Sequence, residues 1–243
     1  MNKYRTLLHS DMRSLTRDPM LLLILIGPLL LILMTRLGLP SLSEWLANRS
    51  GYDLTDHTMF ISLFMLVLIP QLIGVAAGLL MLDERDEHIV DYYAVSPLRK
   101  SGYLAYRLIA PVFVGAGMSL AFVVVSGISE LTGNRMLPLL LFVMEAPLFA
   151  LFLVAFSANK VEGLALSKLI TLTLLGPAGA YLVAEPWQWF AGLLPTYWPS
   201  KLFLEQVSAE TDWQRQAIVF GAGIVVHSLL LYGLLKRFLN RVE

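Results

Sequence analysis

Two ionisable residues lie inside long apolar stretches of the chain, where burying a charge costs several kcal/mol and suggests a function. Glu145 lies midway along one stretch, and His227 lies inside the last one. Both stretches would cross a bilayer in the same direction, and a rise of about 1.5 Å per helical residue puts the two side chains at similar depth. Such a pair can exchange a proton, or a neutral Glu145 can hydrogen-bond a neighbouring helix. Together with Gln71, these residues are candidates for a transport pathway.

Charged residues are also dense in the segment LDERDEHIVDYYAVSPLRK, residues 82–100, which lies between two very apolar stretches. It mixes acids and bases with the pairs Tyr92-Tyr93 and Ser96-Pro97. Mixed charges of this kind give a polar contact a fixed orientation on a protein partner. The alternative is a solvated loop whose bases only set the membrane topology.

Catalytic sequence motifs are absent. The chain has no H-E-x-x-H, no G-x-S-x-G and no G-x-x-x-x-G-K-[ST] phosphate loop. It has no cysteine, and its four histidines are scattered along the sequence. We therefore expect no catalytic residue, metal or cofactor in this chain, and any energy source in another one. A net charge of zero gives no case for nucleic-acid binding.

The elements that must position these residues are membrane-spanning helices. The composition is 57% hydrophobic and 15% charged, with a mean hydropathy of +0.68. A bilayer core of about 30 Å requires about 20 apolar residues in a helix. Six stretches of the sequence meet this requirement: 20–37, 58–82, 104–130, 136–158, 163–183 and 217–240. The prediction is an all-α integral membrane protein with one transmembrane domain over residues 1–243.

Lysines and arginines in short loops predict the orientation, because they collect on the cytoplasmic side. Most of them fall on one side of the six spans: Lys3, Arg5, Arg13, Arg17, Arg85, Arg99, Lys100, Arg107, Lys160, Lys236, Arg237 and Arg241. The other side has fewer: Arg49, Arg135, Lys201 and Arg215. Both termini and residues 83–102 are therefore predicted to be cytoplasmic, in a multi-pass protein of the cell membrane.

Two segments outside the spans also have recognisable patterns. Apolar residues recur at helical spacing in residues 1–18, which predicts an amphipathic interfacial helix, the alternative being an unstructured basic tail. Residues 184–216 contain EPWQWFAGLLPTYWPSKLF, which is rich in tryptophan and proline. Aromatic residues and prolines at an interface favour short external helices that dip into the outer leaflet over an aromatic belt that only anchors the helix ends. Within the second span, Gly74 and Gly78 are spaced for close helix packing.

The order of these elements resembles the membrane-spanning subunit of type-2 ABC transporters over essentially the whole chain. In that family the loop after the second span reads as an acidic cluster, a short helix, and Ser-Pro followed by a base. Residues 83–87, 89–95 and 96–99 follow this order, although His88-Ile89 replaces the usual Gly-Thr. LPTYWPSKLF, residues 194–203, is similar to the family's external motif.

The resemblance implies a permease subunit that exports a hydrophobic or amphipathic drug, peptide or lipid across a prokaryotic cell membrane. Residues 83–102 would form a cytoplasmic coupling loop, with the contacts to an ATPase made by Asp83, Glu84, Arg85, Asp86, Glu87, Tyr92, Tyr93, Ser96, Pro97 and Arg99. An external gate would comprise Pro195, Tyr197 and Trp198.

The same resemblance implies two copies of a separate ATP-binding subunit, which would hold ATP and Mg, and a second permease copy, identical or related. The coupling loop is then expected to present its charges to the ATPase. Two alternatives from other classes remain open at this point. One is an ion-coupled secondary transporter that uses Glu145 and His227, and the other is a channel or a membrane scaffold that transports nothing.

Overall fold

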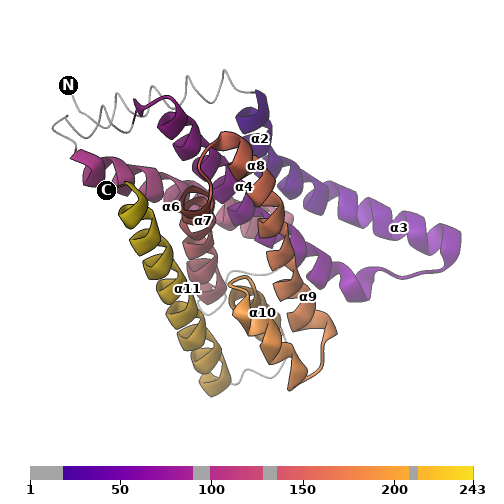
Figure 1. Ribbon diagram of the computed structural model, residues 1–243. Helices are drawn as coiled ribbons and strands as arrows, with labels where there is room; N and C mark the ends of the chain where they lie inside the picture. The colour runs from indigo at the N-terminus through magenta and orange to yellow at the C-terminus, as the bar shows by residue number, and fades with distance from the viewer. Residues whose placement is uncertain (1–18, 90–98, 128–135, 208–212, 243) are drawn as a thin grey trace.

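The computed structural model describes residues 19–89, 99–127, 136–207 and 213–242, and these residues form helices joined by short connections, with no strand among them (Figure 1). The elements are α2 (Pro19–Leu33), η1 (Met34–Gly38), α3 (Leu39–Ser50), η2 (Thr55–His57), α4 (Thr58–Asp86), α6 (Arg99–Ser126), α7 (Leu137–Phe156), α8 (Lys160–Ile170), η4 (Thr171–Leu174), α9 (Leu175–Leu182), η5 (Trp187–Leu193), α10 (Tyr197–Val207) and α11 (Trp213–Val242). Six helical segments are long and apolar enough to cross a membrane, which confirms the predicted fold class.

The centre of the bundle is the pair α4 and α7. Their apolar windows are 67% and 72% buried, whereas that of α11 is 17% buried. The two helices approach closely because α4 presents glycine to α7. A Cβ at Gly74 would lie 2.5 Å from the carbonyl oxygen of Ala146, and one at Gly78 would lie 3.0 Å from Cβ of Leu153. The glycine spacing in the sequence therefore serves a contact within this chain.

The helix that contains the first predicted span is longer than that span. It continues past residue 37, through a π-helical turn at η1 and along α3 to Ser50. It ends only at Gly51, whose φ of 68° is the left-handed conformation that glycine adopts easily, and whose N–H bonds the Ala47 carbonyl. The predicted span ends at residue 37 because hydropathy reports the apolar stretch, whereas a helix continues until something breaks it. In Figure 1, α3 extends to the side of the bundle opposite α11.

Four further helices also extend beyond the apolar stretches that predicted them. α4 runs through the acidic cluster to Asp86, α6 begins at Arg99, α8 begins at Lys160 and α11 begins at Trp213. Residues 83–86 are therefore the last turn of a long helix, which corrects the expectation of a loop that starts at 83. The predicted interfacial helix at 1–18 and the centre of the coupling segment, residues 90–98, lie outside the described residues.

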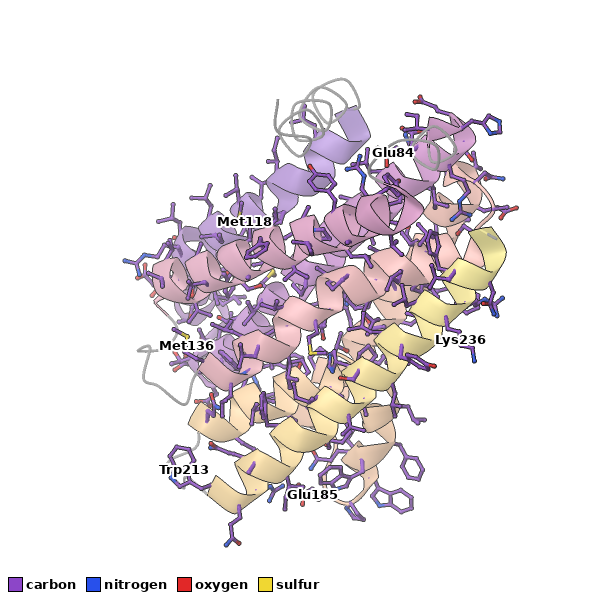
Figure 2. All side chains as sticks on the ribbon, turned by 90° about the vertical axis from the view of Figure 1, so that its left-hand side faces the viewer. Glu84, Met118, Met136, Glu185, Trp213 and Lys236 are labelled. Carbon is purple, nitrogen blue, oxygen red and sulfur yellow. The ribbon has the colours of Figure 1, made fainter. Side chains whose placement is uncertain are left out.

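Short helices precede the last span, as predicted for residues 184–216. η5 and α10 follow α9, and α10 packs against α7, α9 and α11. Figure 2 shows Glu185 and Trp213 near one end of the bundle and Glu84 near the other. These two ends and the middle of the bundle hold the candidate site residues.

Candidate functional site

The C-terminal turn of α4 attaches to three other helices through consecutive charged residues. Glu84 is buried, and its carboxylate accepts a hydrogen bond from the Tyr103 hydroxyl and forms a salt bridge with Arg107, both on α6. Arg107 is buried as well, and its guanidinium lies over the Tyr103 ring at 5.7 Å. Because each charge of the pair is compensated inside the protein, the contact fixes α4 against α6.

Arg85 points the other way and fastens α4 to the end of α7. Its Nη1 donates to the Ser157 carbonyl at 2.9 Å, and its Nη2 donates to the Val154 carbonyl at 2.8 Å. The last carbonyls of a helix have no partner within the helix, and that end carries partial negative charge. The guanidinium therefore donates hydrogen bonds to two carbonyls at the C-terminal end of α7. It also lies 5.9 Å from the Phe238 ring of α11.

The two aspartates of the same turn hold the start of α8. Asp83 pairs with the Lys160 ammonium at 3.1 Å, and Asp86 accepts a hydrogen bond from the Lys160 backbone N–H at 2.9 Å. Asn159 caps the same helix by accepting from the Glu162 N–H at 2.9 Å. A carboxylate at a helix N-terminus also suits the positive end of the helix dipole. We call these contacts of residues 83–86 the α4 clamp.

The predicted coupling residues thus divide into three groups. Those of the α4 clamp have partners within the chain, and the expectation that they contact an ATPase stays a prediction. Glu87 is exposed. The predicted residues whose side chains fall outside the described part are Tyr92, Tyr93, Ser96, Pro97 and Arg99. His88 follows Glu87 and has a φ of 58°, a backbone conformation that favours glycine. The type-2 ABC transporter subunits that this chain resembles have Gly at this position.

Glu145 on α7 and His227 on α11 face each other. The two side chains have no exposed surface, and His227 Nε2 lies 4.0 Å from Glu145 Oε1. The similar membrane depth predicted from the sequence did not show whether the two side chains are in contact. The structure places them next to each other. Gln71, the third predicted pathway residue, bonds elsewhere: its Nε2 donates to Thr173 Oγ1 at 2.7 Å and joins α4 to η4.

The predicted external gate residues are packed. Pro195, Tyr197 and Trp198 are buried, and Trp198 Nε1 donates to the Gly192 carbonyl at 2.9 Å. The Trp189 ring lies 6.2 Å from the Tyr197 ring and 6.1 Å from the Trp198 ring. Trp189, Tyr197 and Trp198 therefore form one aromatic cluster at this end of the bundle.

Sequence reasoning missed an ion-pair cluster beside these aromatic residues, which we call the outer cluster. Lys201 is buried and its Nζ contacts Glu185 at 3.1 Å, Glu205 at 3.3 Å and Gln188 Oε1 at 3.1 Å. Arg215 pairs with both glutamates and so joins α10 to the start of α11. The hydrogen bond from Lys201 is the main reason why the pKa of Glu185 lies below its usual value. The i, i+4 spacing of Lys201 and Glu205 was the available signal in the sequence.

Within the described residues, no group of three or more histidine, aspartate or glutamate side chains is placed to hold a metal ion.

Comparisons with known proteins assign the whole arrangement to a family. Two curated relatives are named fluoroquinolones export permease protein, one from each of two strains of Mycobacterium tuberculosis. Each is 26% identical to this chain over 237 residues, which cover 94% of this chain and 91% of the relative. No solved structure matches the chain significantly. The family described as fluoroquinolones export permease protein Rv2686c-like matches residues 11–235, and the chain, a multi-pass membrane protein, belongs to that family of export permeases.

Proposed function

We propose that this chain is the membrane-spanning subunit of an ATP-driven exporter, and that fluoroquinolone-type drugs are among its hydrophobic or amphipathic substrates. The observation that carries the proposal is the family match over residues 11–235, together with the names of the two relatives. The six apolar helices supply the path through the bilayer. Export is outward, and both termini face the cytoplasm, as the excess of bases on one side favours.

A separate ATP-binding subunit, present in two copies, would hold ATP and Mg and supply the energy. The α4 clamp supports a coupling role for the segment that follows it. Glu84 holds α6, Arg85 holds α7 and Asp86 holds α8, all within one turn of helix. A displacement applied just beyond this turn would move the ends of four helices together, because packed helices shift as rigid bodies. A second permease copy would complete the transporter.

Purifying the chain together with its associated proteins tests whether it binds a separate ATP-binding subunit. The chain is extracted from its own membranes in a mild detergent, and the retained proteins are identified by mass spectrometry. We expect a protein with a G-x-x-x-x-G-K-[ST] phosphate loop. Tyr92→Ala and Tyr93→Ala should weaken its retention while the chain still inserts, whereas Ser167→Ala, an exchange in the second half of α8, should not. Arg85 is unsuitable for this test because its guanidinium holds α7. Drug export by the purified chain with no such ATPase would contradict the proposal.

An ion-coupled transporter is the second candidate, and the contact between Glu145 and His227 is the observation that favours it. A titratable pair at mid-membrane depth is a common element of proton-coupled transport. The two candidates differ in their energy source. An ionophore that collapses the proton gradient should stop export by the second mechanism and leave the first unaffected.

A further inference from the structure

α11 attaches to the bundle along one buried stripe, and His227 belongs to it. The buried residues Gln216, Val219, Gly223 and His227 follow one another at intervals of three and four, so they share one face of the helix. A Cβ at Gly223 would lie 2.7 Å from a methyl group of Leu141 on α7, so the two helices are in close contact one turn before His227. α11 packs against α7 and α10, and its opposite face is exposed.

The hydrogen bonds of His227 fix where one of its protons lies. Nδ1 is 2.8 Å from the Gly223 carbonyl oxygen. A carbonyl can only accept, so Nδ1 must carry the hydrogen. In the neutral imidazole, Nε2 then has a lone pair, and this is the atom that faces Glu145. Neither Nε2 nor the two oxygens of Glu145 has a hydrogen-bond partner in the structure.

Among the described residues, no further titratable side chain hydrogen-bonds or pairs with Glu145 or His227. Residues 58–82 of α4 and 108–126 of α6 contain no acid, base, histidine or tyrosine, and Glu145 is the only such residue of α7. α8, which also packs against α7, carries Lys160, Glu162 and Lys168. α10 brings Tyr197, Lys201 and Glu205, of which the two charged residues belong to the outer cluster. The remaining titratable residues of α11 are Arg215, which is in that cluster, and Tyr232, Lys236, Arg237 and Arg241 beyond the pair.

We propose that Glu145 and His227 together form a binding site for one proton in the middle of the membrane, and that the shared proton fastens α11 to α7. With the proton on Glu145, a neutral acid faces a neutral imidazole. With the proton on Nε2, a carboxylate faces an imidazolium. Both forms have no net charge, whereas a second proton, or none, leaves an uncompensated charge among apolar side chains.

The ligand is a proton because the site has no exposed surface through which a larger cation could enter. The 4.0 Å separation is about 1 Å longer than a direct hydrogen bond, so a small side-chain rotation brings the donor and acceptor together. Movement of α11 away from α7 would separate the pair in its neutral form, which costs less in hydrocarbon than separating two charges. The site stands independently of the proposed function.

Nitrogen NMR of His227 in the full-length protein in liposomes tests the site. His227→Asn identifies the signals by their loss. We expect a protonated Nδ1 in all other variants, and an Nε2 signal that reports a hydrogen bond or a shared proton. Glu145→Ala should shift Nε2 to the position of a free lone pair, while Glu145→Gln should largely retain the bonded signal because its amide donates. Gln71→Ala, which removes a buried hydrogen bond elsewhere, should change neither nitrogen.

An Nε2 signal that is insensitive to Glu145→Ala, or a doubly protonated His227 in that variant, overturns the proposal. Thermal stability gives an independent readout through Glu145→Ala, His227→Ala and the double variant. If one proton joins the two residues, the double variant loses less melting temperature than the sum of the two single losses, because either change alone already removes the shared contact. Additive shifts in melting temperature overturn the fastening role.

Discussion

Replacing Glu84 should destabilise the protein strongly, since this carboxylate is the buried partner of Arg107. The side chains of Arg107 and Glu84 are 5% and 11% exposed, so solvent cannot take over the lost contact. Removing one partner of a buried ion pair costs about 3–5 kcal/mol, because the other charge stays buried without compensation. We therefore expect Glu84→Ala to lower the free energy of unfolding by about that amount. Glu84→Gln should cost less, because its amide still accepts from the Tyr103 hydroxyl.

Equilibrium unfolding in mixed detergent micelles, followed by circular dichroism, measures the change. The matched control is Glu87→Ala, since Glu87 is an acid close by in the sequence but exposed. An exposed substitution of this kind changes stability by about 0.5 kcal/mol or less. The double variant Glu84→Ala and Arg107→Ala should be less destabilised than the sum of the single changes. Equal costs for Glu84→Ala and Glu87→Ala would refute the buried pair and with it the α4 clamp.

Two further predictions concern the core and the outer cluster. Gly74→Ala should destabilise the bundle by about 1–3 kcal/mol, because the new Cβ meets the Ala146 carbonyl oxygen, whereas Gly117→Ala, which meets nothing within 4 Å, should be neutral or stabilising by up to about 1 kcal/mol. Unfolding in the same micelles compares them. Lys201→Met should make stability less sensitive to acid. Because the pKa of Glu185 is lowered mainly by Lys201, this carboxylate stabilises the fold above its ordinary pKa of about 4.3, and the contribution is lost as the pH falls through the lowered value.

If Gly74→Ala were as well tolerated as Gly117→Ala, α4 and α7 would not be in the close contact described. For the outer cluster, melting temperatures are recorded in an acid series for the wild type and Lys201→Met. Identical slopes for the two proteins would show that Lys201 does not stabilise the charged form of Glu185.

Hydropathy predicted the helical spans because the bilayer constraint acts locally, on stretches of about 20 residues. The same constraint singled out Glu145 and His227 as buried ionisable residues. Their contact needed the packing of α7 against α11, which lies between segments far apart in the sequence and leaves no trace in either one.

The α4 clamp was not predictable for a related reason. Asp83, Glu84, Arg85 and Asp86 form a run of charges, which usually indicates a solvated face. Consecutive helical residues point in directions about 100° apart, so in a packed bundle each of them meets a different neighbour. Tyr103 and Arg107 on α6 gave no signal except their helical spacing. In the outer cluster, the sequence identified Lys201 only as a basic residue on the external side of the membrane.

Transport by the reconstituted complex tests most directly whether this chain exports drugs with energy from ATP. The chain and its ATP-binding partner are inserted into liposomes with the ATPase facing outward, and the accumulation of a labelled fluoroquinolone inside is followed. We expect accumulation that requires ATP, stops when the phosphate-loop lysine of the ATPase is replaced, and continues when an ionophore abolishes the proton gradient. Accumulation that proceeds without ATP and stops with the ionophore would contradict ATP-driven export.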